Sequence, residues 1–145
     1  MSNVDERAVA IARSWIGTPY LHQASVQGAG ADCLGLLRGV WRGLYGDEPE
    51  IVPAYTPDWS EPDGSERLWA AALRHMRPVP GNMPWQDGQV LLFRMRTGAV
   101  AKHLGLSAGK LGQSNFIHAF SGHGVVESPL SSPWQRRVVA RFAFP

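Results

Sequence analysis

Cys33 is the only thiol in the chain, and it stands in the stretch GAGADCLGLLRGVW, where a glycine-containing loop meets an apolar run with helical spacing. One interpretation is a buried structural cysteine, because Cys33 lies on the apolar stripe of its helix and free cysteines are often buried. The other is a nucleophile. The first turn of a helix has unpaired N–H groups and a positive dipole end, which lower the pKa of a thiol and can hold an oxyanion.

A thiolate nucleophile needs a histidine base with an orienting partner, and two histidines in expected strands are candidates. His103 has the small residues Ala101 and Gly105 on its strand face, so we expect room there for the helix that carries Cys33. His118 lies between two phenylalanines on its face, and a desolvated imidazole needs a hydrogen-bond partner, which the ring of His103 can supply. Either histidine alone can be structural; the three residues together predict a Cys–His–His site.

The other three histidines have different expected positions. His22 lies in the loop before the cysteine helix and can line a site, whereas His75 ends a helix and His123 lies in a turn, so both are expected to be structural. No two histidines have ligand spacing on one helix, and there is one thiol. We therefore expect no metal site and no cofactor.

Helices and strands must position these candidate site residues. Apolar spacing predicts helices over residues 4–16, from Cys33 to a cap at Gly46, and from Ser65 to the stop at Pro78, with Asp32 as the N-cap of the second. Ser2 and Asp5 resemble a capping box for the first helix. Short β-rich runs follow, over 88–95, 100–107, 115–120, 124–128 and 136–144. Helices first and strands after predict an α+β fold, in which N-terminal helices pack on a C-terminal antiparallel sheet.

Composition excludes several classes of function. The net charge is +2, and the basic residues are scattered, so nothing predicts nucleic-acid binding. No run is long and apolar enough for us to expect a membrane-spanning segment, and we do not expect the N-terminal stretch, with its two early acidic residues, to be a signal peptide. A chain with one cysteine cannot form an internal disulfide, which indicates synthesis in a reducing compartment, the cytoplasm.

The segments ARSWIGTPYLHQ, ADCLGLLRGVW, QDGQVLLFRM, KHLGL, NFIHA and GVVESPL occur in the order found in NlpC-type (NlpC/p-sixty) cysteine peptidases of bacterial cell walls. The resemblance covers nearly the whole chain and is greatest to the branch coded with phage tails and gene transfer agents. It implies a papain-like fold in a single peptidase domain over residues 1–145. It also implies that Cys33 is the nucleophile, that His103 is the general base and then acid, and that His118 orients His103.

The resemblance further implies that Tyr20, in GTPY, places its hydroxyl near the oxyanion. With it we expect Asp32, His22 and Trp59 to border the substrate. The sequence departs from the family at Leu34, which replaces a serine that often follows the cysteine, and in a long insertion over 46–85.

This insertion is rich in proline and carries Tyr55, Trp59 and Trp85 outside any apolar helix stripe. One hypothesis is that it packs beside the cleft and narrows it around a branched peptide. The other is that its aromatic residues form a small satellite core.

Family members hydrolyse amide bonds of peptidoglycan stem peptides, often between D-γ-glutamyl and a diamino acid. The resemblance therefore implies a cysteine peptidase with an acyl-enzyme mechanism, a peptidoglycan peptide as substrate, phage-like tail proteins as further partners, and action in a phage-like particle at the cell wall or periplasm. A different class stays open: a structural tail component that binds the wall without cutting it. A third alternative is lipid acyl transfer on the same fold.

Overall fold

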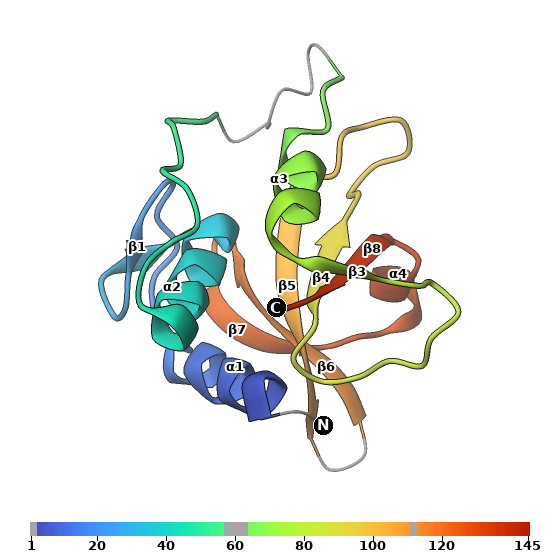
Figure 1. The fold of residues 1–145 in the computed structure, drawn as a ribbon, viewed down its shortest axis with the longest axis horizontal. Helices are drawn as coiled ribbons and strands as arrows, with labels where there is room; N and C mark the ends of the chain where they lie inside the picture. Colours follow the sequence, from blue (N-terminus) through green and yellow to red (C-terminus); the bar gives the residue numbers. More distant parts are fainter. Residues whose placement is uncertain (1–2, 57–63, 111–112) are drawn as a thin grey trace.

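A computed structural model describes residues 3–56, 64–110 and 113–145 (Figure 1). Its elements follow the chain as α1 (Asn3–Ser14), β1 (Ser25–Val26), β2 (Gly30–Ala31), α2 (Cys33–Tyr45), α3 (Arg67–His75), β3 (Arg77–Val79), β4 (Val90–Phe93), β5 (His103–Lys110), β6 (Gln113–Phe120), β7 (Gly124–Pro129), α4 (Ser132–Gln135) and β8 (Val138–Ala143). In the described ranges, six strands pair antiparallel in the order β3–β8–β4–β5–β6–β7. The predicted α+β architecture is confirmed.

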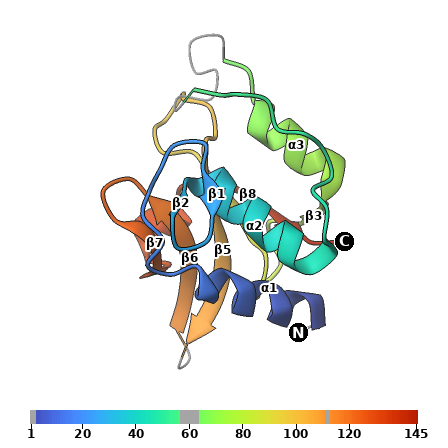
Figure 2. The same cartoon turned by 90° about the vertical axis from the view of Figure 1, so that its left-hand side faces the viewer.

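The sheet separates two apolar cores, because alternate residues of a strand point to opposite faces. Val90 and Leu92 of β4 join the larger core, which α1, α2 and α3 cover, while Leu91 and Phe93 join a smaller one beside α4. All four side chains are fully buried. Figure 2 shows α1 and α2 on the same side of the sheet. The central strands are thus fixed from both faces, which gives the residues at their ends a rigid support.

Helix α2 begins and ends as the sequence predicts. The carboxylate of Asp32 accepts a hydrogen bond from the N–H of Gly35 at 2.7 Å, which satisfies one of the unpaired donors of the first turn. At the other end Gly46 takes a positive φ of 89°, and its N–H donates to the carbonyl of Arg42 at 2.8 Å. Cys33 therefore occupies the first helical position.

A row of glycines on α2 brings neighbouring segments close to the helix. A Cβ at Gly35 would lie 1.8 Å from the carbonyl oxygen of Ala24, and one at Gly39 would lie 2.1 Å from the ring of Trp15. Only hydrogen fits at these positions. The glycines allow the loop before α2, and Trp15 directly after α1, to pack against the helix that carries Cys33.

Several boundaries differ from the expectations. Helix α1 ends at Ser14, two residues before the end of the predicted range, and Ile16 is 45% exposed in the turn that follows. The capping role of Ser2 lies outside the described residues. Helix α3 begins at Arg67, two residues later than predicted. The carboxylate of Glu66, the residue before it, does not cap the helix and accepts hydrogen bonds from Arg94 and from the N–H of Ala101 instead.

Four short elements were not expected: β1, β2, β3 and α4. Pro78, predicted to end a helix, lies inside β3, which is an edge strand of the sheet and therefore tolerates a residue without an N–H. None of the described helices is long and apolar enough to cross a membrane.

Candidate active site

The thiol of Cys33 lies where the start of α2 meets the start of β5. Its sulfur donates a hydrogen bond to the carbonyl oxygen of Lys102 at 3.6 Å, and Lys102 directly precedes His103. Cys33 keeps part of its surface exposed. The structure therefore places the thiol against the peptide bond that leads into the candidate base.

The two strand histidines are hydrogen-bonded to each other, as predicted. Nε2 of His103 lies 2.8 Å from Nδ1 of His118, and both side chains are buried. The ring of His118 packs against Phe116 at 4.1 Å and Phe120 at 5.4 Å between centroids. Trp134 of α4 covers both histidines, with centroids 5.9 Å from His103 and 5.4 Å from His118. The aromatic residues pack around both imidazoles and bury His118 almost completely, while His103 keeps one side on the cavity described below.

A cavity of about 170 Å³ connects the predicted site residues. Cys33 and His103 both line it, as do three of the residues expected to border the substrate: Tyr20, Asp32 and His22. His118 stands behind His103 and does not line the cavity. The remaining lining residues are Tyr55, Met95, Lys102, Ala119, Phe120 and Ser121.

Asp32 organises one wall of this cavity. Besides capping α2, its buried carboxylate accepts a hydrogen bond from the N–H of Gln23 at 2.7 Å and another from the hydroxyl of Tyr55. Nδ1 of His22 lies 3.7 Å from the same carboxylate, and Nε2 of His22 lies 2.9 Å from the carbonyl oxygen of Tyr55. The loop before α2 and the segment after it are therefore joined at the edge of the site.

Burial disfavours the charged forms of both members of the Cys–His pair in the unliganded protein. It raises the pKa of the Cys33 thiol to about 12, and the negative charge of Asp32 acts in the same direction. The N–H groups of Cys33, Leu34 and Leu104 lower this pKa but do not reverse the shift. Burial, followed by the proximity of His118, lowers the pKa of His103 to about 3. The expectation that the helix N-terminus depresses the pKa of Cys33 is therefore wrong for the free protein, because desolvation of the thiolate outweighs the helix.

The raised pKa of the Cys33 thiol predicts slow alkylation of the folded protein. At neutral pH the thiolate fraction of Cys33 is smaller than that of an ordinary cysteine, whose pKa is about 8.5. Iodoacetamide should therefore react more slowly with the folded protein than with the urea-unfolded chain, and the rate should still be rising above pH 9. Intact-mass measurements from pH 6 to pH 10 give both rates. A plateau below pH 8.5 in the folded protein would show a stabilised thiolate instead.

The expectation that the small residue Gly105 leaves room beside His103 for the helix of Cys33 is wrong. Gly105 does not admit α2: a Cβ there would lie 2.9 Å from the ring of Phe116 and 3.4 Å from that of Phe93, on the other face of the sheet. The small residue makes space for the aromatic cluster that supports the histidine pair. Cys33 reaches the site from the end of the strand.

The insertion over 46–85 divides between the two hypotheses. Tyr55 lines the cavity and so follows the cleft hypothesis. Trp85 does not: Arg141 lies over its ring at 4.6 Å and also donates to the carbonyl oxygens of Pro80 and Met83, which makes this stretch structural. Trp59 lies outside the described residues.

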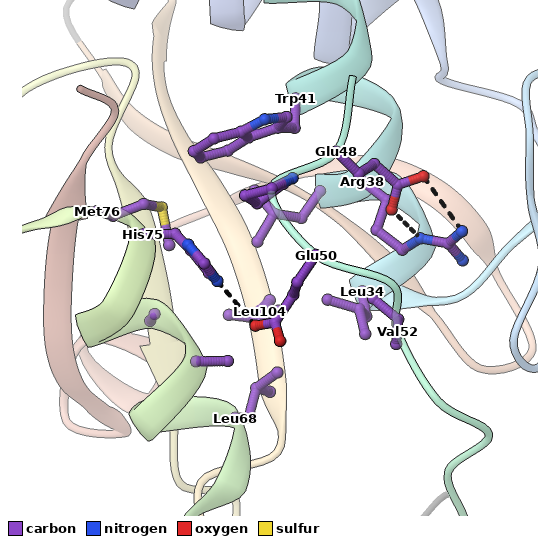
Figure 3. Close-up of a pocket in the computed structure, with 14 residues that line it drawn as sticks. Leu34, Arg38, Trp41, Glu48, Glu50, Val52, Leu68, His75, Met76 and Leu104 are labelled. Carbon is purple, nitrogen blue, oxygen red and sulfur yellow. Dashed lines mark hydrogen bonds and ion pairs between the residues drawn. The ribbon is translucent and has the colours of Figure 1, made fainter. Parts of the chain in front are cut away.

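A second, apolar pocket of about 90 Å³ lies between α2, α3 and the segment around Glu48 and Glu50 (Figure 3). Leu34, the residue that departs from the family pattern, points here rather than into the cavity with Cys33. Glu48 pairs with Arg38 at 2.6 Å, and Glu50 lies 2.8 Å from Nε2 of His75. No side chain that lines this pocket is a thiol or a hydroxyl, whereas Cys33 and His103 line the other cavity.

His75 and His123 lie outside the site, as expected. His123 stacks on Phe120 with centroids 5.3 Å apart. Across the described part of the chain, no group of three or more His, Cys, Asp or Glu side chains is arranged to hold a metal ion.

No protein-family model and no curated protein matches the chain. Solved structures do. An NlpC/P60 family protein from Bacillus cereus ATCC 10987 is 17% identical, with a TM-score of 0.66 over 97% of this chain and 40% of that chain. Ly7917 with the hydrolyzing product of MDP is 15% identical, with a TM-score of 0.61 over 97% of this chain and 63% of that chain.

An N-acetylmuramoyl-L-alanine amidase from Bacteroides uniformis ATCC 8492 is 13% identical, with a TM-score of 0.53 over 93% of this chain and 96% of that chain. The chain spans less than two thirds of the first two proteins. These likenesses show that the fold is the papain-like α+β fold of NlpC/P60 proteins.

Proposed function

We propose that this chain is a cysteine peptidase that hydrolyses amide bonds in the stem peptides of bacterial peptidoglycan, as a single domain of the NlpC type. One observation carries the proposal: Cys33, at the start of a helix, lines one cavity with His103, whose ring is held by His118. The shared fold supports the substrate class. Among its neighbours are a protein described as an N-acetylmuramoyl-L-alanine amidase and one solved with the hydrolyzing product of MDP.

The mechanism starts from a neutral pair. The sulfur of Cys33 attacks the amide carbonyl, and the thiol proton passes to Nδ1 of His103. Nδ1 takes this role because Nε2 of His103 is hydrogen-bonded to His118. The N–H of Cys33 and the hydroxyl of Tyr20 stabilise the oxyanion. His103 then protonates the leaving amine, and the C–N bond breaks to give a thioester. A water molecule, deprotonated by His103, attacks the thioester; the C–S bond breaks, and the acid and the thiol are released.

The neutral forms of Cys33 and His103 are compatible with this mechanism. Because the pKa of Cys33 is raised and that of His103 is lowered, a resting ion pair is disfavoured, and the proton moves when negative charge passes from sulfur to the oxyanion. Substrate binding also excludes water, which strengthens the N–H and hydroxyl contacts to that oxyanion.

Tyr55 is expected to shape the substrate cleft through Asp32. Tyr55→Phe keeps the ring but removes the hydroxyl that donates to this carboxylate, so we expect kcat/KM on peptidoglycan fragments to fall about tenfold, as for a lost hydrogen bond to a charged group. The melting temperature should stay nearly level. Tyr45→Phe is the matched control, because its hydroxyl bonds the carbonyl oxygen of Pro145 away from the cavity. A fall in melting temperature with unchanged kcat/KM would assign Tyr55 to stability alone.

Release of amines tests the proposed function against the alternative of wall binding without cleavage. Each hydrolysed amide yields one free amine and one carboxylate, so incubation with purified peptidoglycan should release amines steadily. A protein that sediments with the wall and releases none would be a binding component. Transfer of a lipid acyl group would instead leave the wall uncut and add mass to an acceptor.

The proposal extends to the setting of the activity. The order of the sequence motifs supports a phage-like tail or gene transfer agent particle as the partner and the cell wall or periplasm as the place of action. Co-purification of the chain with assembled particles tests this extension.

A further inference from the structure

A fourth polar group continues the line of side chains behind Cys33. Nε2 of His118 lies 3.0 Å from Oγ of Ser128, on the side of the ring opposite His103. His118 and Ser128 come from neighbouring strands, β6 and β7, where Phe116 pairs with Ser128 and His118 pairs with Val126. Since residues two apart share a face of the sheet, the hydroxyl and the imidazole meet diagonally across the strand pair.

Two hydrogen-bond patterns fit the same distances. In the first, Nε2–H of His103 donates to Nδ1 of His118, and Nε2–H of His118 donates to Oγ of Ser128. In the second, every donor is reversed, and the hydroxyl of Ser128 donates to His118. Only the first leaves a lone pair on Nδ1 of His103 to receive a thiol proton. It also gives the protonated ring of His103 an acceptor in a site that strongly disfavours its charge.

We propose that Ser128 is a positioning residue for the reaction: its hydroxyl accepts the Nε2–H of His118 and thereby keeps the Nδ1 lone pair of His118 directed at His103. The catalytic part of this inference rests on the proposed function. Ser128 does not line the cavity that holds Cys33, so it acts through His118 rather than on the substrate. Without its hydroxyl, the Nε2–H of His118 loses its acceptor, and the reversed tautomer becomes competitive.

The tautomer of His118 tests the inference without any substrate. Long-range ¹H–¹⁵N spectra of histidine-labelled protein distinguish a protonated from an unprotonated ring nitrogen. We expect His118 to be protonated at Nε2 in the wild type and in Ser128→Thr, which keeps the hydroxyl, and to shift toward protonation at Nδ1 in Ser128→Ala. A wild type protonated at Nδ1, or an unchanged tautomer in Ser128→Ala, would overturn the proposal.

Kinetics provide the second measurement. Ser128→Ala should lower kcat about tenfold, equivalent to about 1.4 kcal/mol, with KM unchanged, and Ser128→Thr should restore most of the loss. Ser114→Ala, at an exposed position on β6, is the matched control. If the wild type cleaves no peptidoglycan, the proposed function fails while the spectra still decide the role of Ser128. If Ser128→Ala does not fold, the wild-type tautomer decides it.

Discussion

His103→Gln should lower kcat about a thousandfold, because it removes the group that takes the proton from Cys33 and returns it to the leaving amine. Glutamine has a similar size and can still bond His118, so the fold should persist. Steady-state kinetics on a defined stem peptide measure the loss, and the melting temperature serves as the control for folding. His118→Ala should cost less, since His118 orients the base and transfers no proton.

These two variants separate the possible mechanisms. Full activity in His103→Gln would rule out the proposed chemistry. Activity unchanged in His118→Ala alone would reduce the site to a Cys–His dyad. A loss in both variants that follows a loss of folding would indicate a structural histidine pair.

Gly35→Ala should destabilise the protein by about 3 kcal/mol, because the new methyl group would overlap the carbonyl oxygen of Ala24. For a chain of this size the melting temperature should fall by about 10 °C. The backbone of Ala24 cannot rotate away as a side chain can. The loop before α2 has to move, and with it the bond between Asp32 and the N–H of Gly35 that starts the helix at Cys33.

Gly43→Ala on the same helix is the matched control. A Cβ there meets the terminal Cδ1 of Ile11 at 2.8 Å, which a rotamer change can relieve, and alanine favours the helix by about 1 kcal/mol. Its melting temperature should change little. Equal stability of Gly35→Ala and the wild type would show that the close approach of Ala24 is not required.

Local patterns were sufficient to predict the parts of the site that local chemistry fixes. An aspartate before an apolar helical run marks the N-cap, so Asp32 and the position of Cys33 followed directly. Alternation within short strands placed His118 between two aromatic rings, and the need of a buried imidazole for a partner pointed to His103.

Tyr55 and Ser128 depend on contacts that no local pattern encodes. Tyr55 lies 23 residues beyond Asp32 in a segment without periodicity, and it reaches the carboxylate only because the segment returns over α2. In the sequence, Ser128 is one residue of a short β-rich run, and only the pairing of β6 with β7 decides which residue of β7 lies beside His118. The repeat of Gly35, Gly39 and Gly43 at every fourth position is a local sequence signal for close packing on α2.

The pKa of Cys33 cannot be inferred from its position at a helix N-terminus alone. Position at a helix N-terminus is visible in the sequence, whereas the burial of the sulfur against the chain that leads into β5 is not. The sign of the shift depends on which effect is larger, and here burial is larger.

Mass spectrometry of peptidoglycan digests tests the central claim most directly. Muropeptides released from purified peptidoglycan by a muramidase are incubated with wild-type protein or with Cys33→Ala, and the masses of the products are measured. The account predicts that wild type yields pairs of new fragments whose masses sum to that of an uncut muropeptide plus one water, and that Cys33→Ala, equally folded, yields none. The same fragments from Cys33→Ala, or no fragments from folded wild type, would contradict it.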